Sequence, residues 1–166
     1  MLSVFDELFT SGYTIEVERT LVLLKPDCVE RGLIGQIIAR FERKGLAICA
    51  LKMIHMDREM AEAHYSEHKD KPFFELLVRY MMHGPLVAMV LCAPGSVEIV
   101  RTMIGNTDGA EAAAGTVRGD FAMCKTYNLV HASDCPESAR KEIEFFFETS
   151  EMFKVPVSGW QECEEK

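Results

Sequence analysis

The sequence predicts an α+β fold in which a four-stranded antiparallel sheet is covered by helices. Four short apolar segments with strand character alternate with segments that have helical periodicity. No internal repeat, low-complexity tract or linker divides the 166 residues, so one domain is expected. This order of elements favours a sandwich with helices on one face of a small sheet, and a ferredoxin-like βαββαβ core is the expected topology.

The N-terminal segment differs in character from the body of the chain. Four of its apolar side chains fall at helical spacing, which predicts one or two amphipathic turns, with a frayed tail as the alternative. These side chains are Val4, Phe5, Leu8 and Phe9. The predicted division is an N-terminal extension (1–17), a domain (18–148) and a C-terminal tail (149–166).

The domain is expected to begin with a buried strand. Residues 19–25 form a nearly continuous apolar run that Pro26 ends, as in a strand buried on both faces. A helix should follow, because apolar residues recur at i, i+3, i+4 and i+7 and Gly45 is placed to end it. These residues are Ile34, Ile37, Ile38 and Phe41. The second predicted strand spans 46–56.

The middle of the chain reads as two helices, a strand and a further helix. The two helices are expected at about 58–68 and 72–83, the second opened by Pro72. The third strand is predicted at 86–92. Apolar spacing then indicates a helix over 97–104.

The last part of the domain contains its longest irregular segment. Residues 106–120 have no hydrophobic period, and ordered loops of this length are usually functional. The fourth strand is predicted at 121–131. A final helix should be capped by Ser133 or Asp134, with Pro136 near its start. Its expected buried face consists of Ile143, Phe146 and Phe147.

The composition excludes several classes of partner and location. A net charge of -8 and a pI near 5.2 argue against nucleic acid and anionic membranes, which require a dominant basic face. No apolar run approaches the roughly 20 residues of a membrane span, and the first ten residues lack the Lys or Arg of a signal peptide. We therefore expect a cytoplasmic protein. The six cysteines form no C-x-x-C pair, so they predict unpaired core residues rather than a zinc site or disulfide framework.

The usual glycine-rich phosphate cradles are absent from the sequence. It has no Gly-Lys-Ser/Thr triplet and no G-x-G-x-x-G turn. The remaining candidate phosphate donors are Lys25, Arg101, Thr107 and Arg118, and converging guanidinium and ammonium groups would suit a polyphosphate. Taken singly, each of these cations is more often a solvated surface charge.

Among the five histidines, His131 is the candidate nucleophile because it ends a predicted strand directly before a helix cap. Glu142 lies 11 residues onward, in a helix that could present its carboxylate to the ring. Such a pair fixes the imidazole tautomer and leaves the other nitrogen free to attack. A packed structural histidine is the alternative. The other four are expected to be surface or structural residues: His55, His64, His68 and His83.

Five segments resemble, in order and spacing, the motifs of the nucleoside diphosphate kinase family. They are ERTLVLLKPD (18–27), RGLIGQIIARFERKG (31–45), HYSEHKDKPFF (64–74), AGTVRGDF (114–121) and NLVHASD (128–134). The similarity covers about residues 18–148. It implies a ping-pong phosphotransferase in which His131 takes the γ-phosphate of a nucleoside triphosphate and passes it to a nucleoside diphosphate.

The resemblance also implies a role for each site residue. The phosphates would contact Lys25, Arg101, Thr107 and Arg118, while Lys25 and Asn128 also reach the sugar hydroxyls. Phe73 would stack on the base, Leu77 would line the base slot, and Tyr65 would stand beside the phosphohistidine. Glu142 would orient His131 with support from Ser133. Mg²⁺ would arrive bridging the nucleotide phosphates and be held mainly by their oxygens, since this ion prefers substrate oxygens to an all-protein cage. Without the resemblance, Phe73 and Leu77 would read as core residues and Tyr65 as a surface tyrosine.

Some positions depart from the family pattern. Ala132 and Thr126 replace common glycines, and Lys125 stands where an apolar residue usually lies beside the base. Gly109 and Ala114 replace prolines in the long loop, which should loosen it. The family forms hexamers or tetramers, and the tail to Trp160 favours a homohexamer. The alternative function is a non-catalytic nucleotide-binding regulatory relative, while the acidic balance disfavours a nucleic-acid-binding module.

Overall fold

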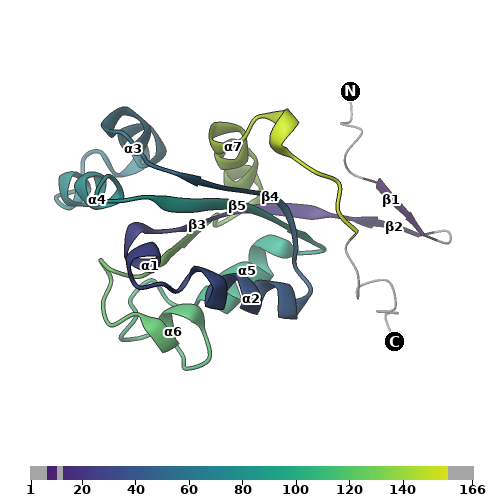
Figure 1. The fold of residues 1–166 in the computed structure, drawn as a ribbon, viewed down its shortest axis with the longest axis horizontal. Coiled ribbons are helices and arrows are strands. Elements are labelled where there is room, and N and C mark those ends of the chain that lie inside the picture. The colour runs from purple at the N-terminus through teal and green to yellow at the C-terminus, as the bar shows by residue number, and fades with distance from the viewer. Residues whose placement is uncertain (1–6, 11–12, 157–166) are drawn as a thin grey trace.

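A four-stranded antiparallel sheet forms the centre of the protein (Figure 1). The computed structural model describes residues 7–10 and 13–156. The sheet has the strand order β4-β5-β3-β6, all neighbours antiparallel, which is the order of a ferredoxin-like core. Its strands are β3 (Glu18–Leu24), β4 (Ala47–Ile54), β5 (Leu86–Ala93) and β6 (Val130–Ala132). The predicted fold class is confirmed.

Helices cover both faces of this sheet, so the expectation of helices on one face was wrong. In Figure 1, α3 (Arg58–His64) and α7 (Pro136–Phe146) lie on one side. The other side carries α1 (Pro26–Glu30), α2 (Ile34–Lys44), α5 (Ser96–Ile104) and α6 (Val117–Phe121). Strand β5 is buried along its whole length, because both of its faces are covered. The described helices include none with the length and apolar character needed to cross a membrane.

Most predicted helices occur close to their expected positions. Gly45 ends α2 in the left-handed conformation, where a side chain would be strained. The helix expected over 58–68 divides into α3 and a 3₁₀ turn, η1 (Ser66–His68), and α4 (Phe74–Met81) follows. The short helix α1 was not predicted, although Pro26 at its first position is a typical helix start. Cys135 caps α7, where Ser133 or Asp134 had been expected.

The predicted fourth strand was wrong over most of its length. Its first residue, Phe121, is the end of α6 (Val117–Phe121), a helix that lies almost wholly in the segment expected to be irregular (106–120). The Thr116 side chain caps this helix by accepting a hydrogen bond from the Gly119 N–H. Strand β6 begins only at Val130. The preceding Leu129 has φ 67°, a left-handed conformation that cannot continue a strand.

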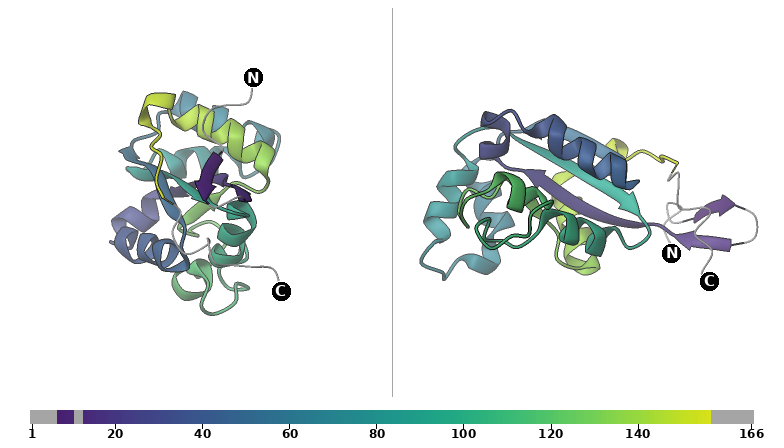
Figure 2. Two further views of the ribbon diagram at one scale, coloured as in Figure 1. Left: turned by 90° about the vertical axis from the view of Figure 1, so that its right-hand side faces the viewer. Right: turned by 90° about the horizontal axis from the view of Figure 1, so that it is seen from below.

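The two ends of the chain also differ from the prediction. Leu8 and Phe9 belong to a hairpin of β1 (Glu7–Thr10) and β2 (Tyr13–Glu16) rather than to a helix, while Val4 and Phe5 lie outside the described residues. Figure 2 shows this hairpin extending beyond the N-terminal end of β3. After α7, a 3₁₀ turn η2 (Thr149–Glu151) leads back to β4, where the Phe153 N–H donates to the Cys49 carbonyl at 2.8 Å. Trp160 lies outside the described residues.

Two cysteines that were expected to be unpaired form a disulfide. Cys49 is the extra residue at an irregularity in β4, and it is bonded to Cys92 on the neighbouring strand β5. Their Cα atoms are 6.4 Å apart, within the range that a disulfide spans. Cys28, Cys124 and Cys135 are free, and Cys163 lies outside the described residues.

Candidate active site

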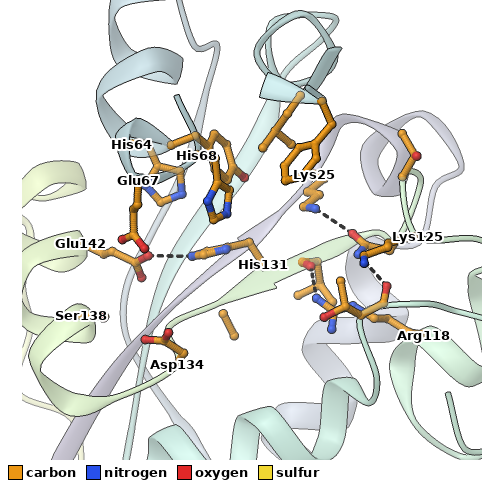
Figure 3. Close-up of a pocket in the computed structure, with 18 of the residues that line it drawn as sticks. Lys25, His64, Glu67, His68, Arg118, Lys125, His131, Asp134, Ser138 and Glu142 are labelled. Carbon is orange, nitrogen blue, oxygen red and sulfur yellow. Dashed lines mark hydrogen bonds and ion pairs between the residues drawn. The ribbon is translucent and has the colours of Figure 1, made fainter. Parts of the chain in front are cut away.

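A cavity of about 470 Å³ brings together residues from seven elements and the loops between them (Figure 3). Every predicted site residue except Ser133 lines it, and Ser133 contacts one of the lining side chains. The predicted lining residues are Lys25, Tyr65, Phe73, Leu77, Arg101, Thr107, Arg118, Asn128, His131 and Glu142. They are spread over 118 positions of sequence (142 − 25 + 1), so only the fold places them in one space.

The imidazole of His131 is held by a carboxylate. His131 lies on β6 opposite Leu23, and its Nε2 is 2.9 Å from Oε1 of Glu142 on α7. Burial alone would raise the pKa of Glu142, but the hydrogen bonds from His131 and Ser133 outweigh it and the pKa is lowered. The carboxylate is therefore ionised at neutral pH and accepts, so Nε2 carries the proton. Within the described residues Nδ1 has no hydrogen bond and retains its lone pair.

Ser133 fixes the carboxylate itself. Its hydroxyl donates to Oε2 of Glu142 and accepts from the Leu21 N–H of β3 at 3.3 Å. The Ser133 side chain is 1% exposed, so these bonds are shielded from water. The carboxylate is thus tied to the central sheet through Ser133, which restricts the orientation of the His131 ring.

Lys25 reaches into the cavity at the end of β3. Its Nζ donates to Oδ1 of Asn128 at 2.7 Å, and the Asn128 amide donates to the Thr107 carbonyl at 2.9 Å. Burial, followed by the charge of Arg118, lowers the pKa of Lys25 to about 8. The cation faces no bonded carboxylate in the described structure, so an anion entering the cavity would restore its pKa.

Arg118 is the most firmly held of the cavity cations. Its guanidinium donates to the carbonyls of Gly105 at 2.9 Å and Val130 at 2.8 Å. The residue is 4% exposed, and in the part of the chain that the structure describes its buried Nε has no hydrogen-bond partner. Burial, followed by the charge of Arg101, lowers the pKa of Arg118 to about 10. Lys25, Arg101 and Arg118 therefore lie together at one end of the cavity. Among the described residues none of the three forms an ion pair with a carboxylate, so their positive charge is available to a polyphosphate.

A buried carboxylate that sequence reasoning missed holds this end of the cavity together. Asp27 accepts hydrogen bonds from the Tyr80 hydroxyl, from the Cys28 N–H at 2.9 Å and from the Leu129 N–H at 3.2 Å. The last bond stabilises the left-handed residue between Asn128 and β6. Asp27 thus positions two segments of the site without lining the cavity. Its place directly after Pro26 in a helix start was the available signal.

Two histidines expected to be surface or ordinary structural residues instead line the cavity. His64 and His68 flank Tyr65, which is itself 7% exposed rather than a surface tyrosine. The ring centroids of His64 and His131 are 4.9 Å apart, and those of Tyr65 and His131 are 6.3 Å apart. The i, i+4 spacing of His64 and His68 was the signal that could have placed both on one side of the segment.

The opposite end of the cavity is apolar and open. Phe73 is 48% exposed, which rules out the alternative of plain core packing for this side chain, while Leu77 is partly buried against the core. His68 meets Phe73 edge to face at 5.7 Å between centroids. Lys125, which departs from the family pattern, lines the same cavity and is exposed. An exposed aromatic face at one end and cations at the other match a ligand with a ring and a phosphate chain.

Comparison with known proteins identifies the family. The model of the nucleoside diphosphate kinase family matches residues 18–152. The chain belongs to the nucleoside diphosphate kinase family. A nucleoside diphosphate kinase of Ignicoccus hospitalis is 54% identical over 147 residues, which are 89% of this chain and 97% of the relative.

Solved structures of family members have the same fold. The halophilic nucleoside diphosphate kinase of Halobacterium salinarum, solved in complex with CDP, matches with a TM-score of 0.82 and 43% identity over 84% of this chain and 93% of that one. A nucleoside diphosphate kinase family protein from Babesia bovis matches with a TM-score of 0.81 and 44% identity over 86% of this chain and 98% of that one. The nucleoside diphosphate kinase fold and the predicted resemblance are therefore confirmed.

Proposed function

We propose that this chain transfers the γ-phosphate of a nucleoside triphosphate to a nucleoside diphosphate through a phosphohistidine at His131. The observation that carries the proposal is the state of the ring: Nε2 is held by Glu142, while Nδ1 keeps a free lone pair in a cavity also lined by Lys25, Arg101 and Arg118. Membership of the nucleoside diphosphate kinase family supports the same activity.

The two half-reactions follow from this geometry. Nδ1 attacks the γ-phosphorus, the bond between phosphorus and the β,γ-bridging oxygen breaks, and nucleoside diphosphate leaves with that oxygen. His131 becomes a cation when it accepts the phosphoryl group, and the Glu142 carboxylate beside Nε2 stabilises it. The terminal oxygen of a second nucleoside diphosphate then takes the group back. Because the transition state is loose, the task of the protein is alignment and charge stabilisation, and no general acid is required.

The cavity accounts for the rest of the nucleotide. Lys25, Arg101 and Arg118 would grip the phosphates with Thr107, and Lys25 and Asn128 lie where sugar hydroxyls would pass. Phe73 would stack on the base above Leu77, and Tyr65 would stand beside the phosphorylated ring. Stacking requires only a flat ring, so we expect acceptance of several bases. The CDP bound to the Halobacterium salinarum relative is a ligand of this class.

We propose Mg²⁺ as the accompanying ion, carried on the nucleotide phosphates. The cavity fits such a substrate, since its cations suit phosphate oxygens and the described residues offer no cage of three or more carboxylates. Besides Glu142, the carboxylates of Glu67 and Asp134 line the cavity, and either would be available to the ion or its water. When bound, the ion neutralises charge on the phosphates.

We also propose a homo-oligomer, with a hexamer favoured. Strand β4 is an edge of the sheet, and it exposes Leu51 (52%) and Met53 (57%), an apolar surface that a second copy would cover. Size measurement of the native protein, with and without residues 1–17, tests this assembly. A monomer in both cases would contradict it.

Incubation with γ-labelled ATP tests the activity directly. We expect a protein-bound phosphate that is labile in acid and stable in base, and we expect His131→Ala to abolish it. Label retained at full level in that variant would move the nucleophile elsewhere. Tight binding of GDP without any transfer would instead support the alternative, a non-catalytic regulatory relative.

A further inference from the structure

His64 is a buried polar residue that the proposed phosphoryl transfer does not use. Its Nε2 is buried and has no hydrogen-bond partner among the described residues, although it lies beside the His131 and Glu142 pair. Burial, followed by the charge of His131, lowers the pKa of His64 to about 3, so the ring is neutral at physiological pH. Buried polar atoms are normally satisfied, so an unsatisfied imidazole nitrogen in a cavity indicates a missing partner.

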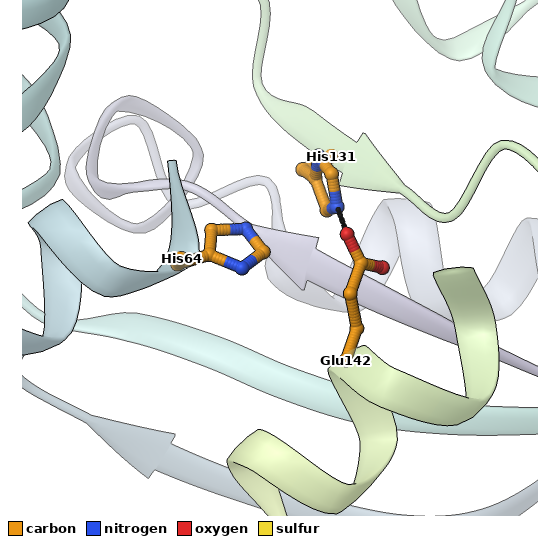
Figure 4. A group of neighbouring side chains, drawn as sticks. All are labelled: His64, His131 and Glu142. Atoms are coloured by element: carbon orange, nitrogen blue, oxygen red, sulfur yellow. Dashed lines mark hydrogen bonds and ion pairs between the residues drawn. The ribbon is translucent and has the colours of Figure 1, made fainter. Parts of the chain in front are cut away.

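The three side chains have the arrangement of a metal site (Figure 4). One ligand atom from each of His64, His131 and Glu142 lies within 4.8 Å of the others, and the described residues contain no other such group of three. Ligands at about 2.0–2.2 Å from zinc lie roughly 3.4 Å apart in a tetrahedron, so shifts of about 1 Å would complete the site. Two imidazoles and one carboxylate, with a fourth position left for water, suit Zn²⁺ and not Mg²⁺.

We propose that His64, His131 and Glu142 bind one Zn²⁺ ion, and that this ion blocks phosphorylation of His131. The first part stands on the geometry of the cluster alone. The second part rests on the proposed function, because it requires His131 to be the nucleophile. The ion is distinct from the Mg²⁺ that would arrive on the nucleotide.

The block follows from the tautomer of His131. Zinc would take the lone pair of Nε2, the nitrogen that already faces Glu142 at 2.9 Å. The proton displaced from Nε2 then resides on Nδ1 of the neutral ring, which removes the lone pair needed for attack on phosphorus. Zinc also engages the carboxylate that would stabilise the phosphorylated, cationic ring. Both effects act on the same step.

Direct binding tests the first part. Nucleotide-free protein should take up one equivalent of Zn²⁺ in competition with a chromophoric chelator, and His64→Asn should weaken that affinity by about 100-fold. His68→Asn is the matched control, since it removes a neighbouring cavity histidine outside the cluster, and it should bind zinc as the wild type does. Glu142→Gln should also weaken binding. Equal zinc affinity in the wild type and His64→Asn would overturn the site.

Labelling with γ-labelled ATP and Mg²⁺ tests the second part. Buffered free Zn²⁺ should suppress the labelling of the wild type, whereas the labelling rate of His64→Asn, whatever its value without zinc, should not change when zinc is added. Labelling of the zinc-loaded wild type at the full rate would overturn the block. If the wild type took no label even without zinc, the proposed function would fail, while the chelator titration would still decide the metal site.

Discussion

The two ends of the cavity are built differently. At the cationic end, which we propose as the phosphate end, Lys25, Arg118 and Ser133 are buried. Lys25 is hydrogen-bonded to the Asn128 side chain, and Arg118 and Ser133 are hydrogen-bonded to the backbone. At the base end, Phe73 and Lys125 are exposed, and no hydrogen bond given by the described structure holds either side chain. Precise placement is needed where a bond is broken, whereas a tolerant surface suffices where any base must fit.

Among substitutions at the two ends of the cavity, Glu142→Gln should have the largest effect on activity. Loss of the charge beside His131 should lower the rate of phosphohistidine formation by about 100-fold, with little change in KM, because the carboxylate acts on the cationic ring and not on the bound nucleotide. Single-turnover labelling measures this rate. Glu137→Gln, an exposed residue on the same helix paired with Lys141, is the control and should be neutral. A pure KM effect would contradict the assigned role.

The second largest effect should be a loss of kcat/KM at high pH, caused by deprotonation of Lys25. Since the pKa of Lys25 in the free protein is about 8, its charge is lost above that pH, and kcat/KM should fall by up to about tenfold for each further pH unit. Lys25→Arg should remove this limb, because a guanidinium stays charged. The effect of pH on stability has the opposite sign. The unfolded chain keeps the Lys25 proton up to a pKa of about 10.5, so between pH 8 and 10.5 the Lys25 contribution to the free energy of unfolding increases. Loss of activity through unfolding in that range would contradict the assignment.

At the base end, Phe73→Ala should have a smaller effect. Loss of one stacking face should cost about 1 kcal/mol of nucleotide affinity, or about a fivefold rise in KM, for purine and pyrimidine nucleotides alike. Steady-state kinetics with ADP and CDP as acceptors measure it. Leu76→Ala, an exposed lining residue in the first turn of α4, the helix that Phe73 precedes, serves as the comparison and should change KM less. A fall in kcat with constant KM would mean that the ring acts on the chemistry.

The smallest effect should follow Lys125→Leu. The exposed ammonium contributes little to binding, and an apolar side chain beside the base should lower KM by about two- to threefold. Comparison of KM across four nucleoside diphosphates measures it. A tenfold change for one base alone would show that Lys125 reads base identity and that the base end is less tolerant than proposed.

The sequence by itself determined the family, the order of the four core strands, and ten of the residues that line the cavity, but not His64 or His68. These predictions came from local features of the sequence. They were the apolar run before Pro26, the helical periodicity that ends at Gly45, and the five family motifs in their order and spacing. Side-chain periodicity reports which face of an element is buried, so regular elements such as α2 and β5 could be predicted.

Only the tertiary structure decided how distant segments meet. The left-handed Leu129, stabilised by Asp27 from another segment, shortened the predicted fourth strand to β6. The disulfide between Cys49 and Cys92 depends on strand register, and the unpartnered nitrogen of His64 depends on α3 lying across from β6 and α7. Contacts between residues far apart in sequence leave no periodic trace in either segment, because each segment alone is compatible with many partners.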